Sequence, residues 1–151
     1  MFKLKFPPVA VMLFFGTLMY FLHLVLPVGE FYFFGRVGLV CFLLVLAFVI
    51  GVLALVDFVR AGTSVDPRKP SKSSRLVVKG IYNYSRNPMY LALLLCLLAW
   101  GLWLGNVFNS ILAALFVSYM NRFQIVPEER ELAKLYGREY RQYCSLVRRW
   151  F

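Results

Sequence analysis

Acidic residues, histidine and cysteine are all scarce in this chain, and their scarcity excludes several kinds of site. Seven Asp and Glu stand against 17 Lys and Arg, and there are one His and three Cys. His23 lies in an apolar run, and one His without a cluster of Cys or carboxylates cannot form a zinc site. Cys41, Cys96 and Cys144 have no CxxC or other paired spacing. We therefore expect no metal, and reduced cysteines that serve in packing.

Motifs of soluble nucleotide-binding domains are also missing. No GxGxxG follows a candidate strand, so the sequence offers no dinucleotide-binding fold of the soluble type. The net charge of +10 would suit nucleic acid, but the remaining polar residues are too few to build a recognition fold. Hydrophobic residues make up 61% of the chain and aromatic residues 18%. This composition is typical of an integral membrane protein.

Four apolar runs fall at about residues 8–28, 37–56, 88–104 and 107–126. A helix needs roughly 20 apolar residues to cross a hydrocarbon core of about 30 Å. The first run is longer than the apolar region of a signal peptide and no small-x-small cleavage pattern follows it, so we expect a helix there. The predicted fold is an all-α integral membrane protein with about four transmembrane helices.

The basic residues are distributed unevenly around these runs. Sixteen of the 17 Lys and Arg lie on one side of the predicted spans, and only Arg36 lies on the other. The positive-inside rule then places both termini and the large central loop in the cytoplasm of a multi-pass protein. The basic residues expected to fix this topology and to touch anionic headgroups are Arg68, Lys69, Lys72, Arg148 and Arg149.

The chain divides into three predicted parts. Residues 1–60 form a two-helix transmembrane hairpin, and residues 61–75 form a basic cytoplasmic loop punctuated by Gly, Pro and Ser. Residues 76–151 hold a second hairpin and a C-terminal helix. Gly105 and Asn106 leave so short a turn that the third and fourth helices are expected to be antiparallel.

A basic, tyrosine-rich motif, KGIYNYSRNPMY at residues 79–90, stands directly before the third apolar run. Pro88 falls where the first turn of a helix would begin, a position at which its missing N–H costs nothing. The positive end of that helix would then face the cytoplasm, with free N–H groups that suit a carboxylate.

A second motif begins at Pro127, which is followed by Glu128 and Glu129. Proline first and acids next is the pattern of a helix start. Apolar residues then recur at spacings of three and four, at Leu132, Leu135, Tyr136, Tyr140, Tyr143 and Val147. We expect an amphipathic cytoplasmic helix that lies on the membrane or folds back over the other helices. The tyrosines could simply anchor the helix at the interface, and the two Glu could simply offset its dipole.

Together, donors and carboxylates at the cytoplasmic ends of a membrane hairpin are the minimum for an enzyme that acts on an amphiphile. The segments LVVKGIYNYSRNPMYLA and NRFQIVPEERELAKLYGREYRQYCSLVRRW, separated by an apolar stretch, resemble the isoprenylcysteine carboxyl methyltransferase and phospholipid methyltransferase superfamily. The resemblance spans residues 76–150. It implies an integral membrane methyltransferase that takes S-adenosylmethionine on the cytoplasmic side and an acceptor from the membrane.

The resemblance also implies a set of site residues. Those matching the cofactor motif are Lys79, Gly80, Ile81, Tyr82, Arg86, Asn87, Pro88 and Tyr90 in the first block, and Glu128 and Glu129 in the second. The backbone at Gly80 would approach the adenosine, and Arg86 or the helix N-terminus would hold the methionine carboxylate. The two Glu would meet the ribose hydroxyls or the ammonium group. Arg122 is the candidate for orienting an anionic acceptor, although an arginine there could equally snorkel to the interface.

Two positions depart from the family pattern, and other functions stay open. Asn87 stands where the family usually has His, and Ala92 where it usually has Gly, which points to a different acceptor. Carboxylate, amine and thiol acceptors all suit an in-line methyl transfer. The same C-terminal pattern also resembles membrane sterol reductases that use NADPH, although their longer sterol-binding region is not found here. A non-catalytic membrane adaptor with the same fold is the other alternative.

Overall fold

The computed structural model describes residues 6–26, 28–62 and 76–151, and this part of the chain is helical. Its only extended pairing is an isolated bridge between Glu30 and Asn106. The elements are α1 (Pro8–Val25), α2 (Arg36–Arg60), the 3-10 turn η2 (Gly80–Asn83), α3 (Pro88–Leu104), α4 (Asn109–Met120), the π-helix η3 (Asn121–Ile125) and α5 (Val126–Leu146). The predicted all-α class is confirmed. Arg68, Lys69 and Lys72, predicted to fix the topology, lie outside the described residues.

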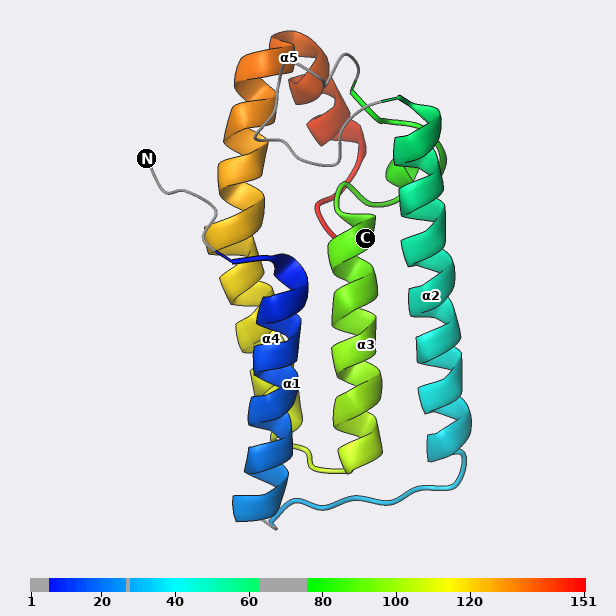
Figure 1. Ribbon diagram of the computed structural model, residues 1–151, viewed down its shortest axis with the longest axis vertical. Helices are drawn as coiled ribbons and strands as arrows, with labels where there is room; N and C mark the ends of the chain where they lie inside the picture. The colour runs from blue at the N-terminus through cyan, green and yellow to red at the C-terminus, as the bar shows by residue number, and fades with distance from the viewer. Residues whose placement is uncertain (1–5, 27, 63–75) are drawn as a thin grey trace.

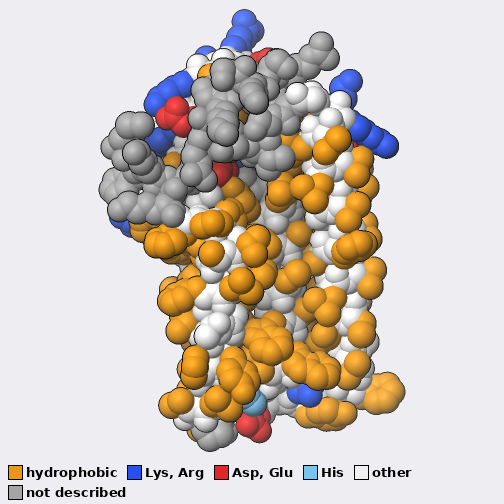
Figure 2. Space-filling model, in the orientation of Figure 1, with side chains coloured by type: hydrophobic (Ala, Val, Ile, Leu, Met, Phe, Trp, Pro, Cys, Tyr) orange, Lys and Arg blue, Asp and Glu red, His pale blue; other side chains and the backbone are white. Residues whose placement is uncertain are grey.

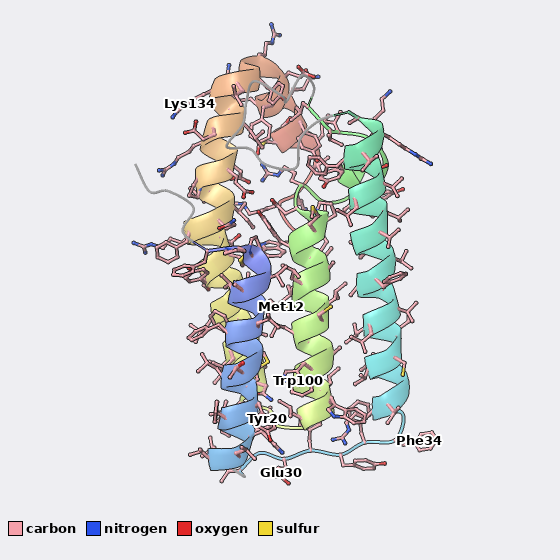
Figure 3. All side chains as sticks on the ribbon, in the orientation of Figure 1. Met12, Tyr20, Glu30, Phe34, Trp100 and Lys134 are labelled. Carbon is pink, nitrogen blue, oxygen red and sulfur yellow. The ribbon has the colours of Figure 1, made fainter. Side chains whose placement is uncertain are left out.

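The long helices stand side by side, with α3 between α2 on one side and α1 and α4 on the other (Figure 1). The α1–α2 and α3–α4 connections lie at one end of the molecule. The end of α2, the start of α3 and the far part of α5 lie at the other end, which we call the polar end. Lys134 marks the polar end and Glu30 the opposite end (Figure 3).

Two helices, α1 and α2, are long and apolar enough to cross a membrane within the part of the chain that is described. The helix α3 has the bounds predicted for the third span, but it is shorter, with 17 residues. The helix α4 has 12 residues and continues through η3 into α5, so the fourth predicted span is not a separate helix. The count of four crossings and the cytoplasmic orientation stay predictions.

The turn between α3 and α4 confirms the predicted antiparallel hairpin and shows why it is so short. Gly105 ends α3 in the left-handed region, with φ of 70°, a conformation that glycine adopts without strain. Asn106 is buried, donates to the Leu26 carbonyl at 2.8 Å and accepts the Phe108 N–H at 3.0 Å. The turn is thereby fixed to the end of α1.

The core lies between α1, α3, α4 and η3. Met19, Phe116, Met120 and Ile125 are fully buried there. Phe15 meets Phe116 edge to face, with ring centroids 5.7 Å apart, which is the favoured geometry for aromatic pairs. Because lipid chains are as apolar as these side chains, close packing rather than exclusion of water holds such helices together in a membrane.

The passage from α4 to α5 explains how the helix accommodates Pro127. A proline inside a helix removes one hydrogen bond, and its ring clashes with the carbonyl four residues earlier. For Pro127 that residue is Phe123, which lies in the wider π-helix η3. The predicted start is confirmed insofar as α5 begins at Val126 and carries Glu128 and Glu129 in its first turn. The chain is nevertheless helical on both sides of that start.

The helix α5 is not one straight amphipathic helix, contrary to prediction. Gly137 has φ of 51° and ψ of −113°, and the chain reverses direction there (Figure 1). The reversal packs Tyr140, Tyr143 and Val147 into a small core with Leu132 and other apolar residues of the first arm. The predicted apolar face therefore folds back on itself, and Leu135 is left 49% exposed.

This reversal predicts a specific sensitivity at Gly137. A Cβ added there meets nothing within 4 Å, so Gly137→Ala should act only through backbone strain and lower the free energy of unfolding by about 2 kcal/mol. Gly38 also has open space around it but lies in a regular part of α2. Gly38→Ala should therefore not destabilise the protein. Equilibrium unfolding in mixed micelles would measure both, and equal effects would contradict the assignment.

Apolar and charged side chains occupy different parts of the surface. Hydrophobic side chains cover the length of the helices, and most Lys, Arg, Asp and Glu gather at the polar end (Figure 2). On α2, Phe42, Phe48 and Leu55 are all exposed. Such a band of exposed apolar side chains suits contact with lipid chains.

Candidate active site

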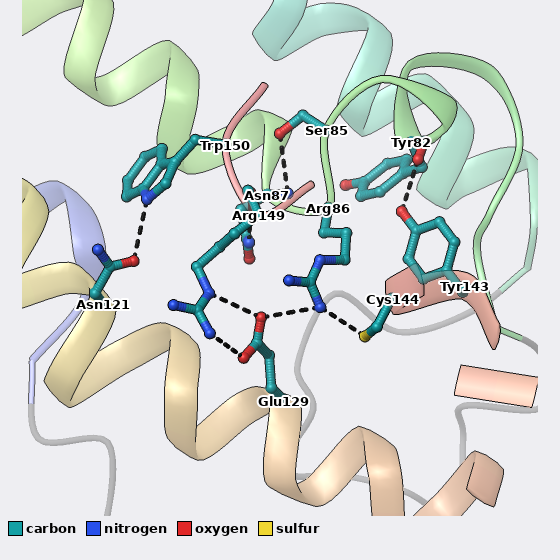
Figure 4. Close-up of polar contacts among 10 residues, drawn as sticks. All are labelled: Tyr82, Ser85, Arg86, Asn87, Asn121, Glu129, Tyr143, Cys144, Arg149 and Trp150. Atoms are coloured by element: carbon teal, nitrogen blue, oxygen red, sulfur yellow. Dashed lines mark hydrogen bonds and ion pairs between the residues drawn. The ribbon is translucent and has the colours of Figure 1, made fainter. Parts of the chain in front are cut away.

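Three stretches that are distant in sequence meet at the polar end (Figure 4). They are the connector from η2 to α3, the helix α5, and the C-terminal segment 147–151. The indole N–H of Trp150 donates to Asn121 Oδ1 at 3.0 Å, which ties the C-terminal segment to η3. The polar residues of both sequence motifs thereby come together.

Glu129 is the centre of this meeting point. Arg149 donates from Nε to Oε1 at 3.0 Å and from Nη2 to Oε2 at 2.7 Å, a two-pronged ion pair. Arg86 Nη1 lies 3.3 Å from Oε1 of the same carboxylate. Two-pronged arginine–carboxylate pairs are among the strongest hydrogen-bonded contacts in proteins. The hydrogen bonds that Arg149 donates to Glu129 raise the pKa of Arg149. Arg149 therefore joins this cluster, and its predicted contact with headgroups stays a prediction.

Arg86 has a second contact and an unused donor. Its Nη1 also lies 2.6 Å from Cys144 Sγ, and its side chain is only 13% exposed. Its Nε is buried and has no hydrogen-bond partner among the residues that the structure describes. A buried donor without a partner is costly, so this guanidinium has capacity for a further acceptor.

Asn87 serves the C-terminal segment. Its side-chain Nδ2 donates to the Arg149 carbonyl at 2.9 Å, and the Arg86 N–H donates to the Arg148 carbonyl at 3.0 Å. The N–H of Asn87 donates to Ser85 Oγ at 3.2 Å. Both the backbone nitrogen and the side-chain nitrogen of Asn87 thus donate hydrogen bonds within the protein. Its neighbour Pro88 is buried in the first turn of α3, as predicted.

Glu128 faces a different group of residues from Glu129. The Tyr90 hydroxyl donates to Glu128 Oε1 at 2.6 Å, and Gln124 Nε2 lies 3.4 Å from the same oxygen. Both Glu128 and Tyr90 are partly buried. The two adjacent glutamates therefore diverge, one toward two arginines and the other toward a tyrosine on α3.

Gly80, whose backbone was predicted to approach the adenosine, lies against Asp57 of α2. Its φ is 67°, and a Cβ added there would collide with the carboxylate of Asp57, 2.6 Å from Cγ. Asp57 Oδ2 also accepts the Ile81 N–H at 2.9 Å. The face of Gly80 where a side chain would stand is thus filled by Asp57 of α2.

Tyr82 is buried at the centre of this turn. Its carbonyl accepts the Tyr143 hydroxyl at 2.6 Å, and its ring meets Phe58 edge to face at 5.4 Å. Burial raises the pKa of Tyr82, of Tyr143 and of Tyr140. The phenols therefore stay neutral at physiological pH, and the Tyr143 hydroxyl holds the second arm of α5 against η2.

The structure does not bring Lys79 and Arg122 into the ion-pair cluster. Lys79 is exposed beside Gly80. Arg122 is exposed on η3, with its guanidinium 5.7 Å from the centroid of the Phe123 ring. Arg122 therefore stands on the surface near the junction of α4 and α5.

An open pocket of about 360 Å³ adjoins the cluster. Its lining residues are Val126, Glu129, Arg130, Ala133, Tyr140, Arg141, Cys144 and Arg149. Three arginines and one glutamate give the lining a net positive charge, which favours a ligand with an anionic group. Within the described part of the chain, no group of His, Cys, Asp and Glu has the arrangement of a metal site.

Sequence reasoning missed Asp57, Tyr143, Cys144 and Arg149 as site residues. A signal existed for Arg149, because the Arg148-Arg149 pair closes the second motif, and for Asp57, because it is the one acid in α2. Tyr143 and Cys144 carried no distinguishing signal.

These features define an all-helical membrane protein with a charged pocket at one end of its helices. A family model described as phospholipid methyltransferase matches residues 34–139. The chain belongs to this family, and the resemblance stated from the two motifs is confirmed. Together with the apolar helices, family membership makes this a membrane protein.

Two relatives extend the comparison. An uncharacterized protein of Haemophilus influenzae is 52% identical over 62 residues, which cover 41% of this chain and 98% of that protein. The Protein-S-isoprenylcysteine O-methyltransferase of Schizosaccharomyces pombe is 33% identical over 92 residues, which cover 59% of this chain. The matched part spans 39% of the length of the yeast enzyme. No solved structure matches.

Proposed function

We propose that the protein is an S-adenosylmethionine-dependent methyltransferase that acts on a membrane-borne or amphiphilic acceptor. The observation that carries the proposal is the cluster of Glu129, Arg86 and Arg149 beside an open pocket at the polar end. Membership of a methyltransferase family supports the reaction type. The apolar surface along the helices (Figure 2) supports an acceptor that arrives from the membrane.

The charges of the cluster fit the amino-acid part of the cofactor. S-adenosylmethionine supplies a methyl group on a sulfonium, and its methionine part carries one carboxylate and one ammonium group. Arg86, with its unpartnered buried Nε, and Arg149 would hold the carboxylate. Glu129, and Glu128 on the other side, would face the ammonium group or the ribose hydroxyls. On binding, the two arginines would exchange the Glu129 carboxylate for that of the ligand, and Glu129 would exchange the arginines for the ligand's ammonium group.

The chain's own residues would then contribute alignment and shielding from water. A free amine, a thiol or a carboxylate needs little acid–base help to accept a methyl group, so in-line placement is the main requirement. Val126 and Ala133 supply apolar wall to the pocket, and Arg130 and Arg141 supply positive charge. Arg122, exposed on η3, is proposed to orient an anionic acceptor that approaches along the surface.

Titration of the purified protein in lipid nanodiscs tests the cofactor. We expect saturable binding of S-adenosylmethionine and of its demethylated product, and no comparable binding of NADPH. Arg86→Ala and Glu129→Gln should each weaken the affinity about 30-fold, because each removes a hydrogen bond to a charged group of the ligand. Isothermal titration calorimetry provides the dissociation constants.

Matched controls separate the site from general charge effects. Arg138 and Glu131 are exposed on α5, and Glu131 pairs only with Lys134 among the described residues. Arg138→Ala and Glu131→Gln should leave the affinity unchanged. Absence of saturable binding, or equal loss in site and control variants, would overturn the proposal, and preference for NADPH would favour a reductase. Transfer of labelled methyl from the cofactor into a lipid extract would then identify the acceptor.

A further inference from the structure

Asp57 is an unusual residue for its position. It lies in the last turn of α2, and it is the one charged residue between Arg36 and Arg60, which begin and end that helix. A carboxylate near the C-terminus of a helix opposes the helix dipole. Asp57 is also half-buried, and the partial loss of its hydration is a second unfavourable contribution. A residue in this position needs compensating contacts, and its contacts lie in the first sequence motif.

Those contacts fix the turn that opens the motif. Asp57 Oδ2 accepts the N–H of Ile81, 24 positions later in the chain, at 2.9 Å. The same oxygen lies closest to where a Gly80 side chain would be, and Oδ1 is 2.7 Å from an added Cβ. Glycine is therefore required at position 80 for two reasons. Its φ is positive, and only a residue without a side chain leaves room for the Asp57 carboxylate.

The residues that follow Asp57 and Ile81 reinforce this contact. Phe58, adjacent to Asp57, meets the ring of Tyr82 edge to face. The backbone carbonyl of Tyr82 accepts the hydrogen bond from the Tyr143 hydroxyl. The turn Gly80–Asn83 is thus held between α2 and the second arm of α5, three residues before Arg86 enters the ion-pair cluster.

We propose that Asp57 is a positioning residue for the cofactor pocket. Its carboxylate fixes the turn η2, and through that turn it sets the place of Arg86 against Glu129. This role rests on the proposed function, because the pocket that it positions is the proposed cofactor site. Asp57 itself does not touch the cofactor.

Substitutions of Asp57 distinguish the effect of its hydrogen bond from the effects of its charge and its size. Asp57→Asn keeps an oxygen that accepts the Ile81 N–H and should bind S-adenosylmethionine almost as the unmodified protein does. Asp57→Leu removes the acceptor and should raise the dissociation constant about tenfold at full binding stoichiometry. A purely structural loss would instead lower the stoichiometry and leave the dissociation constant of the folded fraction unchanged.

A double-substitution cycle tests the contact with Gly80. Gly80→Ala should weaken binding strongly when Asp57 is present, because the new methyl group displaces the carboxylate. In an Asp57→Ala background the clash with the carboxylate is removed and only the backbone strain of the positive φ remains, so the effect should be smaller and the two effects are not additive. Additive effects would show that the carboxylate and the glycine do not act together. Glu30→Gln, exposed at the opposite end of the molecule, is the control and should change nothing.

Hydrogen exchange at the Ile81 amide makes the test independent of the cofactor. Exchange there should be about tenfold faster in Asp57→Leu than in Asp57→Asn, because only the first loses the acceptor. Unchanged exchange, or an unchanged dissociation constant in Asp57→Leu, would overturn the positioning role. If the unmodified protein does not bind S-adenosylmethionine, the proposed function fails. The exchange at Ile81 still decides whether Asp57 holds the turn.

Discussion

Replacing Glu129 with alanine is expected to lower the free energy of unfolding by about 3 kcal/mol, one of the two largest losses predicted for a single substitution in this protein. The reason is that Arg86 and Arg149 share this one carboxylate. Arg86 is only 13% exposed and would remain as a mostly buried charge without its counter-charge. Equilibrium unfolding in mixed micelles without added cofactor would measure the loss.

Two comparisons make this prediction specific. Glu129→Gln keeps an oxygen acceptor and should lose only about half as much stability. Glu131→Ala, two residues away and exposed, removes one surface ion pair with Lys134 and should lose no more than about 0.5 kcal/mol. A loss at Glu129 as small as that at Glu131 would mean that the cluster contributes nothing to folding.

Replacing Phe116 with alanine is expected to have a similar effect through packing alone. Phe116 is fully buried between α1, α3 and α4, and it meets Phe15 edge to face. Truncation leaves a cavity and removes an aromatic pair, so we expect a loss of about 3 kcal/mol in the free energy of unfolding. The value lies at the low end for such a change because lipid supplies no hydrophobic drive between helices.

The neighbouring residue provides the control. Leu115 is 51% exposed on the outer face of α4. Leu115→Ala replaces contacts of leucine with lipid by contacts of alanine with lipid. It should therefore change the free energy of unfolding by less than about 1 kcal/mol. If both substitutions destabilised the protein equally, α4 would not present one packed and one lipid-facing side.

The sequence predicted the helices well wherever the signals were local. The bounds of α3 agree with the prediction because Pro88 and Gly105 punctuate an apolar run at both ends. The end of α1 was placed three residues too late, because the apolar run was followed to Val28. Pro27 was the local signal for the earlier end, since the residue before a proline disfavours the helical conformation.

The reversal at Gly137 was not predicted because the apolar spacing of three and four continues through it. A single straight helix satisfies that spacing as well as two arms packed on each other do. The backbone angles of Gly137 decide between them, and a glycine permits that conformation without demanding it.

The ion-pair cluster shows a similar limit. The resemblance to a known family gave Arg86 and Glu129, but only the three-dimensional arrangement shows that Arg149 joins them. The partners of Glu129 lie 43 residues before it and 20 residues after it. No periodic pattern relates positions so far apart. The contact between Gly80 and Asp57 was not predicted for the same reason, since Asp57 lies on another helix.

The fold-back at Gly137 also has a consequence for the order of events during biosynthesis. The apolar helices α1 to α4 emerge first, and Arg86 emerges before Glu129 and Arg149. The charged cluster is incomplete until the second arm of α5 has turned back and the C-terminal segment has reached the start of α3. A chain in which residues 147–151 have not yet folded back would lack Arg149 beside Glu129 and in the lining of the pocket. The proposed pocket would therefore be complete only after this segment has packed against the start of α3.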